Sequence, residues 1–284
     1  MALKINYNFQ SDFTHANMLK TEAAVNKNLE RLATGHRINR AADDAAGLFI
    51  ADQLKTYAIS LDQGTRNAQD GVSIAQIAQG SLSEVYNILN DVKAKSIQAA
   101  NTVDTNSQKA LQQDINKLVD AIGKIFSDTE FNGTKLFDGD GQTFTIHYGG
   151  RTNQELAITS SSVSVTAGSD DSSASTVVLG GNTYTIDVTS QTAANGTIQT
   201  VDDLIKAVDN EAAKFGSAQI ELEKIISNNE TARVNTSDAE GRIRNVDFAK
   251  EMAEFTKNNI LMQSGTSMLA QANQQSQLVL QLLR

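Results

Sequence analysis

Residue types that commonly carry chemistry are sparse in this 284-residue chain. The three histidines, His15, His36 and His147, lie far apart, and no two have the spacing of a helical metal-binding pair such as H-x-x-x-H. The alternative is a metal site that the three histidines form together in the folded chain. The chain has no cysteine, which excludes disulfides and thiolate metal ligands. We expect no enzyme, and no catalytic, cofactor-binding or metal-binding residues.

Three further groups have both a chemical and a structural interpretation. Asp43-Asp44 is a carboxylate pair that suits a metal ion, but a helix N-cap explains it better. Gly149-Gly150 precedes no Lys-Ser/Thr pair and lies between two expected strands, which indicates a turn and not a phosphate-binding loop. Arg242 and Arg244 have the charge to hold an acidic ligand, but structural ion pairs are the favoured role.

Composition disfavours several kinds of partner. The net charge of −9 argues against nucleic acid and against anionic membrane surfaces. No apolar stretch approaches the length of a membrane-spanning helix, so we expect no membrane insertion. The chain has 10 Phe, 5 Tyr and no Trp or Pro, which favours long helices with thin cores. Its first residues do not resemble a standard signal peptide, so secretion would need a dedicated export route.

Helical periodicity dominates the first half. A heptad-like seam from Met18 to Leu32 ends near Gly35, where glycine can terminate a helix. A second helix is expected from about 43 to 101 and a third across 111–125, where apolar residues alternate at spacings of four and three. At 1.5 Å per residue the second helix would be on the order of 90 Å long, which predicts a rod.

Glycines 47, 64, 71 and 80 fall inside the second expected helix. Each costs about 1 kcal/mol relative to Ala on an exposed helix face. Either the helix is frayed or broken at these positions, or the glycines allow neighbouring helices to approach closely. The sequence favours neither interpretation.

The middle of the chain has the alternation of β-strands. Two runs, 144–148 and 156–158, flank the loop GGRTNQ as a hairpin, and a second hairpin turns at 180–182. Between Thr159 and Thr200, 18 of 42 residues are Ser or Thr. A solvent-facing β surface is the favoured interpretation, and a carrier of O-linked sugars is the alternative.

The C-terminal part is again helical. A capping box, Thr200 with Asp203 three residues on, predicts the start of a helix, and the last 45 residues form a further one. Polar residues such as Asn259 and Asn273 interrupt the apolar seam of this last helix. Buried polar groups destabilise a structure unless they are paired. We therefore expect both ends of the chain to need a partner outside their own helix.

Long stretches at both ends resemble bacterial flagellin. Residues 29–54, LERLATGHRINRAADDAAGLFIADQL, are similar to the family pattern ERLSSGxRINxAxDDAAGxxIA, and the similarity continues through 65–89. TEFNGTKLF (129–137) is similar to QFNGxxLL, and RIRNVDF (242–248) to SRIRDADYA. The end, 258–284, is similar to the terminal signature of the family.

The resemblance covers about 1–165 and 200–284 and implies a mainly α fold with a small β part. Paired N- and C-terminal segments would form a long antiparallel helical coiled-coil rod, with β-hairpins in the middle. The expected parts are an N-terminal inner-tube helix (1–42), a shell domain (43–165), a short variable surface β segment (166–199), the return helix of the shell (200–238) and a C-terminal inner-tube helix (239–284).

The implied function is that of a structural subunit, exported by the flagellar type III apparatus, that polymerises into the extracellular bacterial flagellar filament for motility. Its partners would be further copies in a helical homopolymer, a cytoplasmic export chaperone at the C-terminal segment, and the filament cap and junction proteins. We assign subunit packing to residues of the matched motifs and terminal seams: Leu29, Leu32, Arg37, Asn39, Asp43, Asp44, Arg242, Arg244, Leu269, Leu280 and Leu283.

Two other functions are the alternatives. A hook–filament junction protein shares the terminal helices, but the full motif in 29–54 and the terminal LAQANQ favour the filament subunit. Some flagellins carry protease insertions in their middle part. Here the middle is short and has no H-E-x-x-H motif, which disfavours an enzyme.

One departure from the family concerns recognition by the Toll-like flagellin receptor of animals. Many flagellins carry an Arg, a Leu and a Glu that this receptor recognises. In this sequence Asp91 stands in place of the Arg, Lys95 in place of the Leu and Asp114 in place of the Glu. We therefore expect weak activation of the receptor or none.

Overall fold

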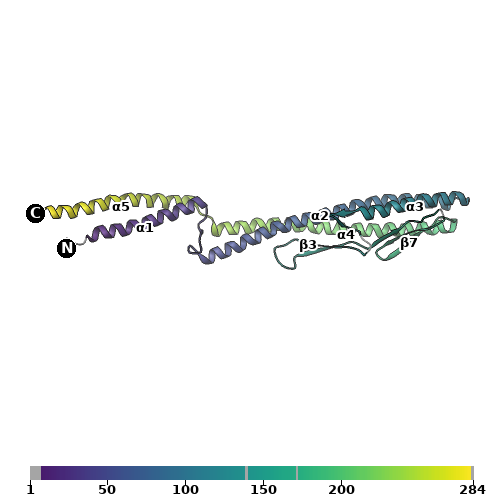
Figure 1. The fold of residues 1–284 in the computed structure, drawn as a ribbon, viewed down its shortest axis with the longest axis horizontal. Helices are drawn as coiled ribbons and strands as arrows, with labels where there is room; N and C mark the ends of the chain where they lie inside the picture. Colours follow the sequence, from purple (N-terminus) through teal and green to yellow (C-terminus); the bar gives the residue numbers. More distant parts are fainter. Residues whose placement is uncertain (1–7, 138–139, 171, 283–284) are drawn as a thin grey trace. The chain divides into compact units, whose positions relative to one another are not determined.

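The computed structural model describes residues 8–137, 140–170 and 172–282, and helices account for most of them (Figure 1). The chain forms two compact units, Met1–Tyr57 with Val234–Arg284 and Ala58–Arg233. The expected mainly helical fold with β-hairpins in the middle is confirmed. The elements are α1 (Phe9–Thr34), α2 (Ala45–Ala100), α3 (Thr105–Asp128), β1 (Glu130–Phe131), β2 (Thr134–Lys135), β3 (Thr143–His147), β4 (Glu155–Thr159), β5 (Val163–Thr166), β6 (Ser175–Leu179), β7 (Asn182–Ile186), α4 (Gln191–Arg244) and α5 (Phe248–Leu282).

In the first unit the two terminal helices lie side by side and run antiparallel (Figure 1). At one end the side-chain amide of Asn8 donates to the carbonyl of Ala272 (3.2 Å). Toward the other end Arg31 pairs with Glu251 (3.5 Å). Residues from opposite ends of the sequence are thus neighbours, as expected for paired terminal segments.

Local signals set the limits of the first two helices. Gly35 ends α1 in the left-handed conformation (φ 73°), and its N–H donates to the carbonyl of Arg31 (2.9 Å). Ahead of α2, the Asp44 carboxylate accepts the N–H of Gly47 (2.9 Å), which is the bond of an N-cap. The N-cap interpretation is therefore confirmed for Asp44.

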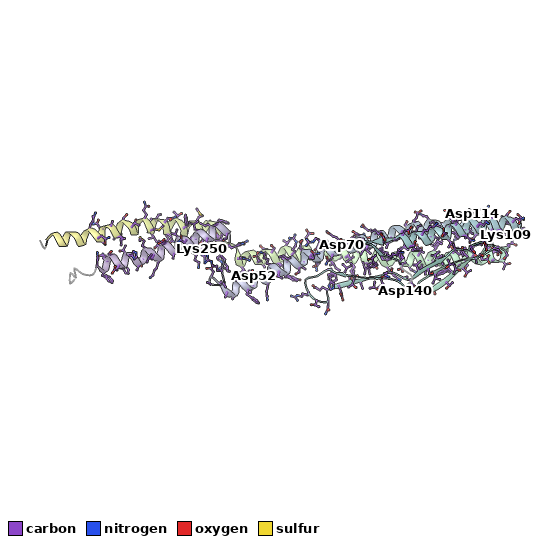
Figure 2. All side chains as sticks on the ribbon, in the orientation of Figure 1. Asp52, Asp70, Lys109, Asp114, Asp140 and Lys250 are labelled. Atoms are coloured by element: carbon purple, nitrogen blue, oxygen red, sulfur yellow. The ribbon has the colours of Figure 1, made fainter. Side chains whose placement is uncertain are left out.

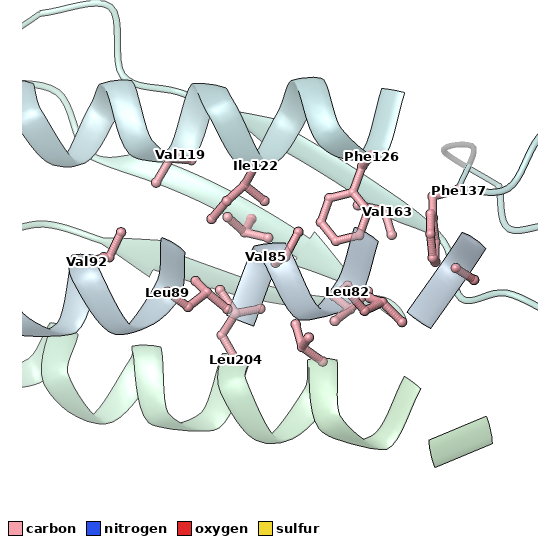
Figure 3. Close-up of a cluster of buried hydrophobic side chains, with 14 of the residues drawn as sticks. Leu82, Val85, Leu89, Val92, Val119, Ile122, Phe126, Phe137, Val163 and Leu204 are labelled. Carbon is pink, nitrogen blue, oxygen red and sulfur yellow. The ribbon is translucent and has the colours of Figure 1, made fainter. Parts of the chain in front are cut away.

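The second unit contains a continuous apolar core between α2, α3, α4 and the strands. Phe137 lies edge-on between the rings of Phe126 (5.1 Å) and Phe215 (5.9 Å) and joins α3 to α4. Figure 3 shows part of this core, to which α2 contributes Leu82, Val85, Leu89 and Val92, α3 contributes Val119, Ile122 and Phe126, and α4 contributes Leu204.

Helix α2 is unbroken across all four glycines, so the frayed-helix interpretation is wrong. A Cβ at Gly64 would collide with the backbone carbonyl of Tyr148, and one at Gly71 would lie 2.8 Å from the side chain of Leu222. These two glycines allow the β3–β4 hairpin and α4 to approach α2. Nothing lies within 4 Å of a Cβ at Gly80, so close approach does not explain that glycine.

The strands pair antiparallel, and both expected hairpins are present. β3 pairs with β4 from Thr143↔Thr159 to His147↔Glu155. β5, β6 and β7 form a three-stranded sheet in that order, and Gly180 and Gly181 (φ 61° and 82°) make the β6–β7 turn. The Ser/Thr-rich segment is not uniformly solvent-facing, because Ser160, Ser175 and Thr197 are buried.

The expected start of the return helix at Thr200 is wrong. Helix α4 begins at Gln191, and the hydroxyl of Ser190 caps it by accepting the N–H of Ala193 (3.2 Å). The Thr200 hydroxyl instead donates back to the Gly196 carbonyl (3.1 Å). Residues 191–199 are therefore helical and not part of a β segment. At its other end α4 extends to Arg244, so α5 starts later than expected.

Candidate assembly surface

The terminal helices leave many large apolar side chains in solvent. Among the described residues of α1, only Val25 and Asn28 are buried. Nine large apolar side chains on the two helices are between 48% and 68% exposed. We call this set the terminal apolar surface: Phe9, Phe13, Leu19 and Leu29 of α1, and Phe248, Met252, Ile260, Leu261 and Met268 of α5.

A buried amide lies in the thin seam between α1 and α5. With its side chain oriented to satisfy both neighbours, Asn28 donates to the carbonyl of Ala24 (2.7 Å) and accepts the N–H of Phe255 (3.1 Å). A satisfied polar residue in a helix pair favours one register over others, at a cost in stability. The seam is thus specific, but it buries little apolar surface.

Backbone bonds tie the segment after α1 to the junction between α4 and α5. The N–H of Arg37 donates to the carbonyl of Arg244 (2.7 Å), and its guanidinium donates to the carbonyl of Ile243 (2.8 Å). The N–H of Val246 donates to the carbonyl of Gly35 (3.0 Å). Arg37 therefore connects two chain segments within the first unit.

Asp43 organises the loop before α2. Its carboxylate accepts the N–H groups of Asn39 (3.3 Å) and Arg40 (3.2 Å) and pairs with Lys27 of α1 (2.7 Å). The bond from Lys27, helped by these backbone donors, lowers the pKa of Asp43 from 3.8 to about 2. The Asn39 amide also donates to the carbonyl of His36 (3.1 Å), so both residues hold the loop closed.

The arginine pair forms ion pairs, which confirms its favoured role. Arg242 pairs with Asp238 one helical turn away (2.8 Å) and is exposed. Arg244 is largely buried and lies near Asp52 (3.3 Å; labelled in Figure 2) and Glu240 (3.9 Å). Its guanidinium thus joins α4 to the first turns of α2 within the first unit.

The predicted leucines have different environments. Leu29 is 51% exposed and belongs to the terminal apolar surface, whereas Leu32 and Leu269 are half-buried. The side chain of Leu280 and all of Leu283 lie outside the described residues. None of these positions tests the packing between subunits, which stays a prediction.

The histidines lie apart in the fold. His15 is exposed on α1, His36 lies beside Asn245 (3.2 Å), and His147 pairs with Glu155 across the β3–β4 hairpin (3.2 Å). Over the described part of the chain, no three His, Asp or Glu residues are grouped as metal ligands.

None of the described helices is long and apolar enough to cross a membrane.

The three altered receptor positions lie on two neighbouring helices. Asp91 is exposed on α2, and Lys95 follows one turn later. The Lys95 ammonium contacts the carboxylate of Asp114 on α3 (2.9 Å; Asp114 is labelled in Figure 2). The hydrogen bond from Lys95 lowers the pKa of Asp114. Two of the three positions therefore form an ion pair within this chain.

Sequence reasoning missed a buried amide network. Gln112, fully buried on α3, donates to Asn116 (2.8 Å) and accepts the N–H of Val188 (2.7 Å). Asn116 also accepts the hydroxyl of Ser175 (2.7 Å) and donates to the carbonyl of Asp170 (3.0 Å). These bonds hold the three-stranded sheet on α3. The available signal was the pair of amides at spacing four beside the apolar stripe.

Two helices also hold the β3–β4 hairpin through its carbonyls. Asn67 of α2 donates to the carbonyl of His147 (2.8 Å), and Asn229 of α4 donates to that of Tyr148 (2.6 Å). Nearby, the buried carboxylate of Glu211 accepts the N–H (2.6 Å) and hydroxyl (2.7 Å) of Ser161. The polar groups of the second unit thus fix strands to helices.

Similarity to known proteins extends over nearly the whole chain. The bacterial flagellin N-terminal helical region matches residues 5–142, and the C-terminal helical region matches 198–283. The flagellin of Halalkalibacterium halodurans is 40% identical over 281 residues, which cover 99% of each chain. The flagellin of Bacillus subtilis is 38% identical over 305 aligned positions, covering 99% of this chain and 100% of that one.

A crystal structure of Bacillus cereus flagellin matches 58% of this chain and 88% of that one, with 21% identity and a TM-score of 0.40. The family assignment depends on the sequence matches alone, which include both terminal regions and two relatives aligned over nearly their whole length. The chain therefore belongs to the bacterial flagellin family and is a structural subunit of the flagellar filament.

Proposed function

We propose that the terminal apolar surface is where copies of this chain pack against one another in the filament. Full burial of a large apolar side chain contributes about 1.5–3 kcal/mol, so a surface of nine such side chains favours association strongly. The single observation that supports the proposal is the exposure of these side chains on α1 and α5.

The same proposal assigns the parts of the chain to the filament. The terminal helices, within 1–42 and 239–284, line the inner tube. Residues 43–165 and the return helix form the shell, and the residues between them face outward. Support comes from the contrast between the thin α1–α5 seam and the continuous core of the second unit. The subunit-packing residues, including Arg37 and Arg244, act by holding the loop geometry on which the two terminal helices depend.

We further propose how the chain reaches the filament. Exposed apolar side chains on α5 would cause the chain to aggregate in the cytoplasm. An export chaperone therefore binds and covers the C-terminal segment until type III export. Outside the cell the chain meets the cap protein at the growing end and junction proteins at the base. The chain performs no catalysis, and its activity is assembly.

Seeded polymerisation tests the packing proposal with a matched pair of variants. Ile260→Gln changes a residue of the terminal apolar surface that is 61% exposed. Ile220→Gln makes the same change on α4, in the second unit, where the isoleucine is 60% exposed. Neither change creates a cavity, so both monomers should keep their helix content.

We expect Ile260→Gln to abolish or strongly slow filament growth, and Ile220→Gln to slow it much less. Electron microscopy and sedimentation of filaments after seeding measure both. Equal growth of the Ile260→Gln variant and the unmodified chain would refute the assignment of this surface. A greater loss of filament growth for Ile220→Gln would show that the main packing surface lies in the second unit.

A further inference from the structure

Two copies of one tripeptide adopt different structures in this chain. Asn-Gly-Thr occurs at 132–134 and again at 195–197. The first copy makes the turn between β1 and β2, and the second lies in the first turns of α4. Because the residues are identical, any difference in their chemical behaviour comes from the fold.

The first copy is a two-residue hairpin turn. Phe131 pairs with Thr134, and both residues between them have positive φ, 51° at Asn132 and 78° at Gly133. These values define a type I′ turn. In such a turn the N–H of the second central residue, Gly133, lies outside the hydrogen bond that closes the hairpin.

The surroundings of this turn are open. Asn132 and Gly133 are both exposed. Nothing lies within 4 Å of the Cβ position of Gly133, so the turn is open on that side of the glycine. Both residues of the turn therefore lie open to solvent, and the bond that closes the hairpin does not hold the Gly133 N–H.

The second copy is also exposed, with open space at the Cβ position of Gly196, but its backbone conformation differs. Asn195 and Gly196 lie within α4, where the helical pattern directs the N–H of Gly196 to the carbonyl of Thr192. The hydroxyl of Thr200 also binds the carbonyl of Gly196 (3.1 Å). Helical dihedral angles are fixed by these bonds, so the Gly196 nitrogen cannot turn toward the Asn195 side chain without local opening of the helix.

We propose that Asn132 is a site of spontaneous deamidation in the folded protein and that Asn195 is protected from it. The Gly133 nitrogen attacks Cγ of Asn132 and forms a five-membered succinimide. The bond from Cγ to Nδ2 breaks, and ammonia leaves with the proton from the Gly133 N–H. Water then adds to one of the two imide carbonyls, and the bond from that carbon to the Gly133 nitrogen breaks. Attack at Cγ yields aspartate, and attack at the main-chain carbonyl of residue 132 yields isoaspartate. The net reaction consumes one water and releases one ammonia.

The product changes the turn in two ways. Either product adds a negative charge, and isoaspartate also places one side-chain methylene in the main chain. Only the two residues of β2 separate the turn from Leu136 and Phe137, which are buried in the core of the second unit. Deamidation therefore modifies the one short hairpin that leads into these two core residues.

Peptide mapping by mass spectrometry of the full-length chain tests the proposal. The folded protein is incubated in mildly alkaline buffer, and a second sample is incubated in denaturant. In denaturant we expect similar rates at Asn132 and Asn195, because the tripeptides are the same. In the folded chain we expect Asn132 to react about tenfold faster than Asn195 or more, since the helix must first open locally.

Two controls assign the product and define the opposite result. Asn132→Gln should remove the fast product from the folded sample, because glutamine forms its cyclic imide far more slowly. Equal rates at the two sites in the folded chain would overturn the proposal. So would an Asn132 that reacts in denaturant and stays intact in the folded chain, since this would show that the turn protects it.

Discussion

At the scale of single residues, Asp43 shows how one carboxylate controls a loop. It contacts Lys27 of α1 and the backbone before α2, and these donors place its pKa at about 2. Because the folded pKa lies below the unfolded value of 3.8, the carboxylate stabilises the fold above pH 3.8. This contribution is lost as the pH falls through about 2.

We predict that Asp43→Asn destabilises the first unit by about 1–2 kcal/mol at neutral pH, a figure discounted because the Lys27 side chain is 48% exposed. The difference from the unmodified chain should vanish near pH 2. Denaturant unfolding followed by circular dichroism across this pH range measures it. A cycle with Lys27→Met separates the ion pair from the backbone bonds. A difference that stays constant down to pH 2 would contradict the assignment.

The three altered receptor positions give a second prediction at this scale. We expect this flagellin to activate the Toll-like flagellin receptor of animals weakly or not at all. Asp91 presents a carboxylate where the family has an Arg, whose planar donor group can anchor an interface. Loss of one such anchor costs at least about 2 kcal/mol, or roughly 30-fold in affinity. The Lys95–Asp114 ion pair adds a charge that binding would have to desolvate or displace.

A reporter-cell assay with monomer compares the unmodified chain with an Asp91→Arg/Lys95→Leu variant. The variant should signal at concentrations at least about tenfold lower. Because Lys95→Leu also frees Asp114 from its ion pair, the single variant Asp91→Arg serves as the control that leaves this pair intact. Full potency of the unmodified chain would show that these positions do not limit recognition.

At the scale of elements, local signals predicted most limits correctly. The end of α1 at Gly35, the cap at Asp44 and the turn at Gly180-Gly181 each depend on a backbone conformation that few residue types supply. The start of α4 was missed because Thr200 and Asp203 match a capping box by sequence alone. Burial of Ala194, Thr197 and Val201 extends the helix N-terminally past Gly196 despite the low helix propensity of glycine.

The polar anchors could not be predicted, because their role depends on partners distant in sequence. Gln112 and its partner Val188 are 76 positions apart, and Asn229 and Tyr148 are 81 apart. A glutamine or asparagine on a helix is usually exposed, so periodicity alone places it in solvent. Only the tertiary fold shows that these amides satisfy strand backbone groups in the core.

Gly64 and Gly80 provide a matched pair on the same helix, α2. We predict that Gly64→Ala destabilises the second unit by about 1–3 kcal/mol, because the new methyl group would collide with the Tyr148 carbonyl. Gly80→Ala should stabilise it by about 0.5–1 kcal/mol, since the methyl group meets open space and alanine favours the helix. Thermal unfolding of both variants measures the two effects. Stabilisation by Gly64→Ala would show that the hairpin does not pack closely on α2.

At the scale of the whole molecule, the two units differ in how their helices are stabilised. In the second unit α3 buries seven residues, among them Ile115, Val119 and Phe126. In the first unit α1 buries two, one of them the polar Asn28. Helical stability in proteins comes mainly from the packing of an apolar face. We therefore expect the terminal helices to gain much of their stability only when other copies cover the terminal apolar surface.

Hydrogen exchange on monomer and filament tests this difference. We predict that amides of α1 and α5 exchange rapidly in the free monomer, because few buried contacts oppose local opening, and that amides of α3 exchange slowly. In the filament both terminal helices should become strongly protected, while α3 changes little and serves as the internal control. Strong protection of α1 and α5 in the free monomer would show that the contacts between these two helices stabilise them without other copies. Assembly would then need another source of free energy.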